Sequence, residues 1–291
     1  VDGDASLRSR NHDVMVGALQ QLGVKVVRAE DEQNLPLRIE GPWAPPASLS
    51  LDISSSSQPT TALCLAACAL PAPVSIQDHG TGVSLRHSEL TKHLCEQTGA
   101  SSSMHKGELT SWTPTVNGSS TIIPPDASML SFALLAAKVS SARVDIKQVP
   151  DTKDALGHEI LFELAQHVGL QIEESTIVAV SKGQFTTVDL RHGNDLITPV
   201  AALFALAGGG EITGAEHAAY KETDRTVGTV DLLEQFGLNA SFEQGCLLVP
   251  GGQVLVSPEG LVRTYGDHRM QMTALVLAMG CTKEVMIEGS Q

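Results

Sequence analysis

The chain has 291 residues, enough for two domains with sizeable cores, and its 42% hydrophobic and 18% charged residues are typical of a globular protein. The formal charge is −14, with 33 acidic against 19 basic residues, which argues against nucleic acid as a general partner because phosphate backbones need a basic surface. The apolar runs are shorter than the roughly 20 residues of a membrane helix, and the first residues are unlike a basic-then-apolar leader, so we predict neither a membrane span nor a secretion signal.

The first recurring element is an amphipathic helix that ends at a glycine and leads into two short strands. In its first copy, Met15, Leu19 and Leu22 fall on one helical face. Each closing glycine fits a helix C-cap, where positive φ is needed. Alternating and β-branched residues after the glycine predict hairpins, such as 24–27 with 36–39. The four copies of the helix are 15–23, 90–99, 161–169 and 230–237.

The second recurring element is a polar turn that opens into an apolar helix. A helix that is apolar all round is expected in a core, and its start suits an anion because it carries unpaired N–H groups and a partial positive charge. A strand is predicted before each turn, at 49–52, 120–123, 187–190 and 261–263, and another after each helix, at 74–76, 143–146, 211–213 and 285–287. The four turns are 54–58, 125–128, 193–195 and 265–272, and their helices are 61–68, 132–137, 200–207 and 273–280.

These elements alternate along the chain as a long repeat. The glycines that close the amphipathic helices, Gly23, Gly99, Gly169 and Gly237, are 76, 70 and 68 residues apart. A period of about 70 residues indicates a supersecondary unit with both helices and strands. We therefore predict an α/β (α+β) fold of repeated βαβαββ-like units, with the first and last units incomplete. The boundary at Pro124-Pro125 would divide the chain into domains at residues 1–124 and 125–291.

Four clusters of polar and charged residues could carry chemistry, and each also has a structural explanation. The arginines of the segment 4–10 could bind a phosphate or carboxylate, or could flank a solvated helix start. At 56–58, N-capping explains one of three hydrogen-bonding side chains but not all three. In the segment 220–225, helical geometry would put the lysine and arginine on one side, for local ion pairs or for an anion. The charges at 267–269 could be a surface cap or a ligand site.

The five cysteines are scattered and odd in number, which favours reduced thiols in the cytoplasm. Cys64 and Cys68 lie one helical turn apart, a spacing that metal ligands can have. Both belong to an apolar helix, however, so we predict that they fill space in the core and bind no metal.

The polar segments, taken in order, resemble the 5-enolpyruvylshikimate-3-phosphate synthases, the 3-phosphoshikimate 1-carboxyvinyltransferases of the shikimate pathway of aromatic amino acid biosynthesis and the target of glyphosate. The segments Lys-Glu-Thr-Asp-Arg at 221–225 and Asp-His-Arg-Met at 267–270 are specific in combination, and the resemblance runs over essentially the whole chain. It implies two domains, each of three repeated units, with the substrates bound in a cleft between them. The other segments that carry it are Asp4 to Arg10, 56–58, 125–128, Asp195 and 265–266.

The resemblance implies transfer of the enolpyruvyl group of phosphoenolpyruvate to the 5-hydroxyl of shikimate 3-phosphate, with release of phosphate and without a metal or cofactor. Asp195 and Glu222 would be the acid/base carboxylates, with Lys221 near the attacking hydroxyl; which group moves which proton stays open. The substrate-binding residues would be Arg10, Arg225, Arg269, Gln58 and His268 for phosphoenolpyruvate, and Ser56, Ser57 and Ser84 for shikimate 3-phosphate. These two anions are the expected partners, with no nucleic acid or membrane.

The chain also departs from the family pattern. Asn11 follows Arg10 where proline is usual, His217 replaces an asparagine or arginine, and Leu85 lies where a basic residue is common. The family's N-terminal Lys-Ser segment, its Gly-rich loop and its last lysine are not found, so we expect a fragment that is weakly active alone. A complete chain would be a monomer.

Other functions compete with this one, among them a pure assembly module, which would leave the polar turns scattered. The alternative to turnover is a truncated or degenerate paralogue that binds phosphorylated ligands. The related UDP-N-acetylglucosamine enolpyruvyl transferases would need a reactive cysteine in a Gly-rich loop, and none of the five cysteines lies in such a loop.

Overall fold

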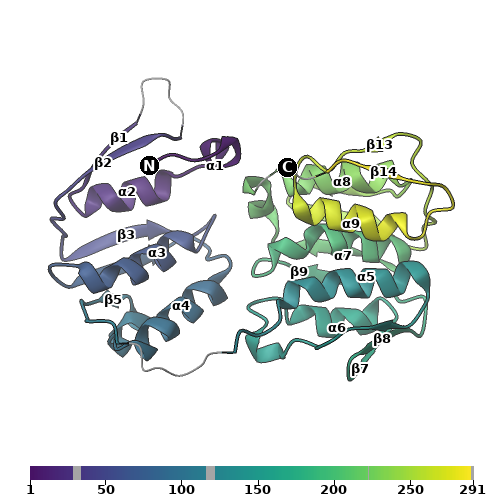
Figure 1. Ribbon diagram of the computed structural model, residues 1–291, viewed down its shortest axis with the longest axis horizontal. Helices are drawn as coiled ribbons and strands as arrows, with labels where there is room; N and C mark the ends of the chain where they lie inside the picture. Colours follow the sequence, from purple (N-terminus) through teal and green to yellow (C-terminus); the bar gives the residue numbers. More distant parts are fainter. Residues whose placement is uncertain (29–33, 116–121, 222, 290–291) are drawn as a thin grey trace. The chain divides into compact units, whose positions relative to one another are not determined.

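A computed structural model of the chain describes residues 1–28, 34–115, 122–221 and 223–289 (Figure 1). The chain divides into two compact units, Val1–Ile122 and Ile123–Gln291, each described here by itself. Their correspondence to the two substrate-binding domains inferred from the sequence stays a prediction. Within the described residues, no helix has the length and apolarity to cross a membrane.

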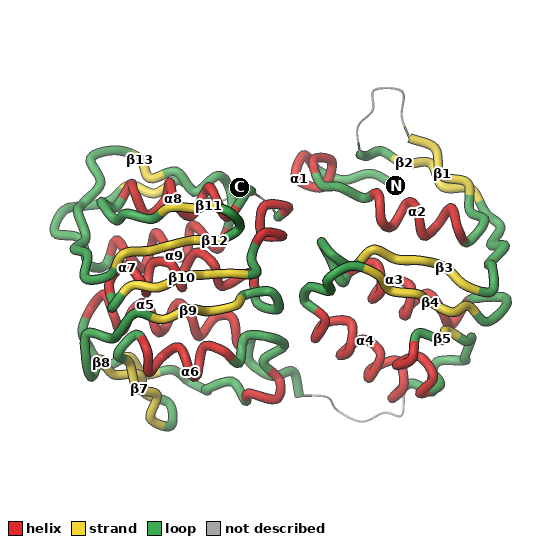
Figure 2. The backbone as a smooth tube through the Cα atoms, turned by 180° about the vertical axis from the view of Figure 1, so that it is seen from behind, coloured by secondary structure: helices red, strands yellow, loops and turns green. Residues whose placement is uncertain are grey.

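The first unit packs helices against a small sheet. Strands β3 and β4 pair in parallel, Leu49 opposite Ile76, and β5 adds antiparallel to β4 (Figure 2). Alternation in β3 turns Leu49 and Leu51 into the core, where they pack with Leu63 and Cys64 of α3. The elements are α1 Ala5–Ser9, α2 Asp13–Gln21, β1 Lys25–Arg28, β2 Leu37–Glu40, β3 Ser48–Asp52, α3 Gln58–Ala66, η1 Ala67–Ala69, β4 Val74–His79, α4 Leu85–Gln97, η2 Ser102–Lys106 and β5 Glu108–Leu109.

The second unit has the larger core. Its four-stranded sheet has the order β11-β12-β10-β9, and a three-stranded sheet has the order β6-β8-β7. The elements are η3 Ala127–Met129, α5 Leu130–Ser140, β6 Val144–Asp145, η4 Thr152–Asp154, α6 Ile160–His167, β7 Leu170–Glu173, β8 Thr176–Ala179, β9 Thr186–Asp189, η5 Asn194–Leu196, α7 Ile197–Leu206, β10 Gly209–Thr213, η6 Glu216–Tyr220, α8 Arg225–Gln235, β11 Ser241–Glu243, β12 Cys246–Pro250, β13 Leu261–Val262, α9 His268–Ala278 and β14 Met286–Ile287.

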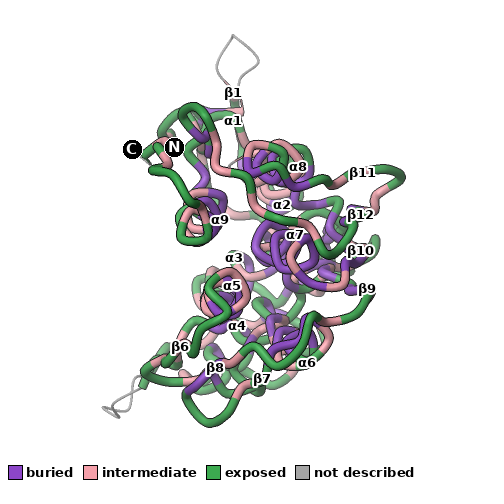
Figure 3. The backbone as a smooth tube through the Cα atoms, turned by 90° about the vertical axis from the view of Figure 1, so that its right-hand side faces the viewer, coloured by how far each residue is buried: buried purple, intermediate pink, exposed green. Residues whose placement is uncertain are grey.

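Helix α7 lies at the centre of this second unit. It packs against α5, α8 and α9 and against β10 and β12, and every residue from Ile197 to Ala205 is buried (Figure 3). The prediction of a helix buried all round is therefore correct for α7. It is wrong for α3 and α9, where Leu65 and Leu275 are 57% and 53% exposed, because each of these helices has one side that no described element covers.

The predicted repeat is present in the strand pairing. Parallel pairs join the strands before and after three of the apolar helices: β3 with β4, β9 with β10, and β13 with β14. The hairpins β1/β2, β7/β8 and β11/β12 are antiparallel and follow Gly23, Gly169 and Gly237, as predicted. After Gly99 the predicted hairpin is wrong for the described residues, where the helix η2 follows and β5 pairs with β4. The closing glycines Gly23, Gly99, Gly169 and Gly237 have φ values of 79°, 108°, 77° and 71°.

The second copy of the repeat departs from this pattern. A strand was predicted at 120–123, but residues 120–121 lie outside the described part, and Ile122 and Ile123 are not in a strand. Both isoleucines are about nine-tenths exposed. Their β-branched sequence has a strand preference, but no strand within the described ranges pairs with them, so that preference is not realised here.

Two glycines give an opposed pair of stability predictions. Gly17 lies inside α2 with nothing within 4 Å of an added Cβ, so Gly17→Ala is expected to raise the free energy of unfolding by about 0.5–1 kcal/mol. At Gly169 the φ is +77° and an added Cβ would lie 2.3 Å from the Ser181 carbonyl oxygen, so Gly169→Ala is expected to cost about 3 kcal/mol. Urea denaturation of both variants checks this, and equal effects would contradict it.

Candidate functional site

The starts of four helices in the second unit bring charged side chains together. Asp195 lies in η5 at the start of α7, Arg225 opens α8, and Arg269 lies in the first turn of α9. Asp267 caps α9, and its carboxylate accepts hydrogen bonds from the backbone N–H groups of Arg269 and Met270. We call Asp126, Ser128, Asp195, Lys221, Arg225, Asp267 and Arg269 the charged cluster.

Arg225 is the most deeply buried member of the charged cluster, at 1% exposure. Its Nε donates to Asp267 Oδ2 at 2.7 Å, and its Nη1 donates to Asp195 Oδ1 at 2.6 Å. Asp267 is completely buried. Burying a guanidinium and a carboxylate costs desolvation free energy. The charge-assisted hydrogen bonds from Nε and Nη1 of Arg225 offset this cost.

Arg269 is engaged more loosely. Its Nη1 donates to Ser128 Oγ at 2.8 Å, while its Nη2 lies 3.6 Å from Asp195 Oδ2. Its Nε is buried and has no hydrogen-bond partner among the described residues. Arg269 is thus a buried cation with unused donors, the kind of group that can receive an anion.

Asp195 lies among three cations. Burial opposes ionisation of its carboxyl, but the charges of Arg269, Lys221 and Arg225 and the hydrogen bond from Arg225 outweigh it and hold its pKa below the usual value. Asp195 is therefore a carboxylate at neutral pH. It can accept a proton or stabilise a cation, and its negative charge offsets part of the positive charge of the arginines.

A neutral imidazole lies next to this cluster. His217, in η6, is buried, and burial together with Lys221 lowers its pKa to about 4. Its Nε2, like Asn194 Nδ2 in the adjoining η5, is buried and lacks a hydrogen-bond partner in the described part of the chain. Such atoms are uncommon in folded proteins, and both are next to the acidic and basic members of the cluster.

Because of His217, we expect the second unit to lose stability in acid. The folded pKa of this histidine is below the unfolded value of about 6.5, so the unfolded state takes up the proton first and stability falls as the pH is lowered from about 6.5 through 4. The contribution reaches roughly 3 kcal/mol at the acid end. We expect His217→Asn to flatten the pH dependence of the unfolding free energy over this window, measured by urea denaturation at several pH values. Replacing the exposed His87 is the control; an unchanged slope in His217→Asn would contradict the prediction.

The remaining predicted residues lie in the first unit. Arg10 ends α1 and is partly buried. Ser56 Oγ accepts a hydrogen bond from the N–H of Gln58, whereas Ser57, the N-cap residue of α3, makes no side-chain capping hydrogen bond within the described residues. Ser57 is buried at the start of α3 while Gln58 is exposed, and Ser84 precedes α4 with φ of +51°. Their part in substrate binding stays a prediction.

Other predictions for the second unit had mixed outcomes. His268 is exposed at the start of α9, and Glu222 lies outside the described residues. The expectation that Lys221 and Arg225 share one side of a helix is wrong: Lys221 ends η6, and α8 begins only at Arg225 because Asp224 caps it. Both cations nevertheless act on Asp195.

The sequence assigned no site role to Asp126 or Ser128, and it left Asp267 open between a surface cap and a ligand site. The available signal was their place at the first turn of apolar helices, which N-capping alone explains. Their contacts with Arg225 and Arg269 join residues 42 and 141 positions apart, and no local pattern shows such pairs.

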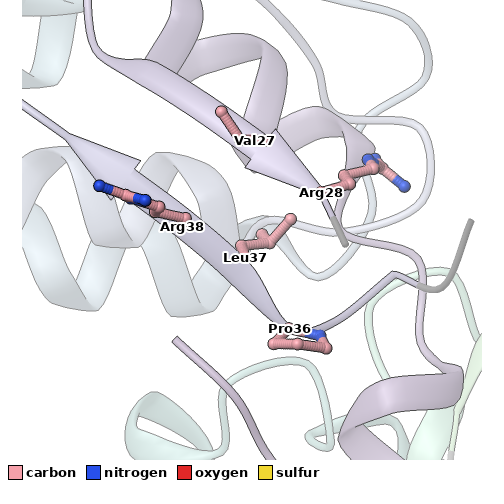
Figure 4. Close-up of a pocket in the computed structure, with 5 residues that line it drawn as sticks. All are labelled: Val27, Arg28, Pro36, Leu37 and Arg38. Carbon is pink, nitrogen blue, oxygen red and sulfur yellow. The ribbon is translucent and has the colours of Figure 1, made fainter. Parts of the chain in front are cut away.

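Two surface hollows lie elsewhere. One, of about 280 Å³, is lined by Val27, Arg28, Pro36, Leu37 and Arg38 on the β1/β2 hairpin (Figure 4). Its two arginines point apart and already pair with Asp13 and Glu40. The other, of about 580 Å³, lies beside α6 and β7. Neither is lined by a member of the charged cluster, so the cluster is the stronger candidate site.

Comparison with known proteins relates the whole chain to one family. The family model of EPSP synthase (3-phosphoshikimate 1-carboxyvinyltransferase) matches residues 1–291. A 3-phosphoshikimate 1-carboxyvinyltransferase of Rhodopseudomonas palustris is 29% identical over 99% of this chain and 68% of its own length. One of Halobacterium salinarum is 27% identical over 99% of this chain and 69% of its own length.

Solved structures share the fold. An EPSP synthase of Acinetobacter baumannii gives a TM-score of 0.66 at 18% identity, covering 99% of this chain and 68% of its own. The enolpyruvyl transferase NikO of Streptomyces tendae gives 0.69 at 14% identity, covering 96% of this chain and 66% of its own. The chain thus spans about two thirds of the length of these proteins.

Proposed function

Because the chain belongs to the EPSP synthase family, we propose that it transfers the enolpyruvyl group of phosphoenolpyruvate to the 5-hydroxyl of shikimate 3-phosphate and releases phosphate. The observation that carries this proposal furthest is the charged cluster of the second unit. Two buried arginines and a lysine act there on a carboxylate that is ionised at neutral pH. Such an arrangement can orient an anionic reactant and supply a proton acceptor.

The reaction has an addition step and an elimination step. In the addition, the 5-oxygen of shikimate 3-phosphate bonds to C2 of phosphoenolpyruvate, the hydroxyl loses its proton and the methylene carbon gains one. In the elimination, the methyl carbon loses a proton, the double bond re-forms and phosphate leaves. Both steps therefore need a group that exchanges a proton with the same carbon, and the addition also needs an acceptor for the hydroxyl proton.

We assign the proton acceptor to the carboxylates and the anion contacts to the cations. Asp195 is ionised because Arg269, Lys221 and Arg225 surround it, which suits a base. Arg269 has unused donors for the phosphate or carboxylate of phosphoenolpyruvate. Lys221 would lie near the attacking hydroxyl, and Glu222 and His268 keep the roles that the resemblance implies.

Residues of the first unit complete the assignment. Arg10 and Gln58 would contact phosphoenolpyruvate. Ser56, Ser57 and Ser84 would contact shikimate 3-phosphate, to which hydroxyls and helix-start N–H groups can donate. The partly buried Arg10 and the placement of Ser56 and Ser57 directly before helix α3 support this part of the proposal.

Calorimetry followed by a phosphate-release assay tests the function. Shikimate 3-phosphate should bind first, phosphoenolpyruvate should then bind to the binary complex, and phosphate should be released faster than from the variant Arg269→Ala. If wild type binds neither ligand, the proposed function is wrong. Binding of both without release of phosphate would favour the alternative, a paralogue that binds phosphorylated ligands without turnover.

A further inference from the structure

Arg269 is held by a segment that lies far away in the sequence. Ser128 Oγ accepts a hydrogen bond from Arg269 Nη1 at 2.8 Å and donates one to Asp126 Oδ1 at 2.7 Å. The same Asp126 oxygen accepts from the backbone N–H of Ser128 at 2.9 Å, which fixes the start of η3. Ser128 is 1% exposed, so water does not readily replace its hydroxyl.

The guanidinium of Arg269 lies farther from the carboxylate of Asp195 than attraction between their opposite charges would favour. Asp195 Oδ1 is already held by Arg225 at 2.6 Å, whereas Asp195 Oδ2 lies 3.6 Å from Arg269 Nη2. A guanidinium beside a carboxylate oxygen normally closes to about 2.8 Å, as the Nε of Arg225 does with Asp267 at 2.7 Å. The hydrogen bond to Ser128 engages the opposite nitrogen and can hold Arg269 short of that contact.

We propose that Ser128 and Asp126 are positioning residues that keep the guanidinium of Arg269 from closing onto Asp195, so that its donors stay available to an incoming anion. This rests on the proposed function in one respect only, the identity of that anion as phosphoenolpyruvate. The orphaned, buried Nε of Arg269 supports it, because an arginine free to settle would pair that group as well.

The variant Ser128→Ala tests the positioning directly. Its crystal structure should show Arg269 Nη2 within about 3.0 Å of Asp195 Oδ2. By calorimetry, the Kd for phosphoenolpyruvate in the presence of shikimate 3-phosphate should rise about tenfold, the usual scale for loss of a hydrogen bond to a charged group. The Kd for shikimate 3-phosphate alone should change less than twofold.

Two further variants separate positioning from stability. Ser131→Ala removes a buried hydroxyl of the next helix, α5, which donates to the Ser128 carbonyl, and should leave Arg269 in place. Asp126→Asn keeps an oxygen that can accept from Ser128 and should behave as wild type. Asp126→Ala leaves the Ser128 hydroxyl without its acceptor and should raise the Kd for phosphoenolpyruvate about threefold.

The outcomes distinguish this proposal from the proposed function. If Arg269 has the same position in the Ser128→Ala structure as in wild type, the positioning role is wrong, regardless of the Kd values of the two ligands. A moved Arg269 with an unchanged Kd for phosphoenolpyruvate overturns it also. If wild type binds no phosphoenolpyruvate, the proposed function fails, while the position of Arg269 in the Ser128→Ala structure still decides the positioning role.

Discussion

Asp267→Ala is expected to lower the free energy of unfolding of the second unit by about 4 kcal/mol. The substitution leaves Arg225 buried at 1% exposure without the carboxylate that holds its Nε, and breaking a buried ion pair costs about 3–5 kcal/mol. It also removes the cap of α9, which is worth about 1 kcal/mol. Guanidinium denaturation followed by circular dichroism measures the loss.

Two comparisons make this prediction specific. Asp267→Asn keeps an oxygen that can cap α9 but removes the charge, so it should cost about 3 kcal/mol and isolate the ion pair. Asp145→Ala breaks a pair with Arg143 in which both side chains are 67% exposed, and should cost far less stability than either Asp267 variant. If the Asp267 variants lost no more stability than Asp145→Ala, the buried pair would not stabilise the unit.

Asp195→Asn is expected to separate turnover from binding. Loss of a proton acceptor should lower the rate of phosphate release by about 10³-fold. Loss of a negative charge beside Arg269, Lys221 and Arg225 should leave phosphoenolpyruvate binding as tight as in wild type or up to about tenfold tighter. Calorimetry and phosphate release measured on the same preparation give both quantities.

The control for this variant is Asp189→Asn at the end of β9. Its carboxylate is 57% exposed and lies 4.0 Å from the Arg191 Nε, outside the charged cluster. Both quantities should stay near wild type. Weaker phosphoenolpyruvate binding in Asp195→Asn would mean that Asp195 organises the arginines more than it competes with the ligand for them, and undiminished turnover would remove it from the proton transfers.

The repeated units could be predicted from the sequence because their signals are local. Gly23, Gly99, Gly169 and Gly237 mark helix ends through their positive φ, and the apolar runs mark the core helices. The degree of burial was predicted correctly only for α7, whose run is the most apolar of the three; the shorter apolar stretches in α3 and α9 leave one side exposed. Only α7 is covered on all sides by helices and strands, which depends on tertiary packing.

The charged cluster could be predicted in part, because the charged helix starts are also local signals. The sequence identifies the starts of α7, α8 and α9 as charged turns, and in the second unit those turns do come together. It does not show that Asp267 pairs with Arg225, or that Ser128 accepts from Arg269, because Asp267 has a sufficient local explanation as a helix cap and Ser128 as part of a polar helix start. Whether a helix-start side chain acts only locally is decided by its distant neighbours.

The charged cluster has a consequence for how an anion would arrive. Among its described members, Asp126, Asp195 and Asp267 balance Lys221, Arg225 and Arg269, so it projects little attraction into solvent, while the chain as a whole carries −14. Long-range electrostatic attraction therefore does not steer an anionic substrate to the cluster. Binding depends on short-range contacts, in which the substrate replaces the aspartates as the partner of the arginines. Raising the ionic strength would shield the repulsion and speed association, the reverse of what a basic phosphate-binding surface shows.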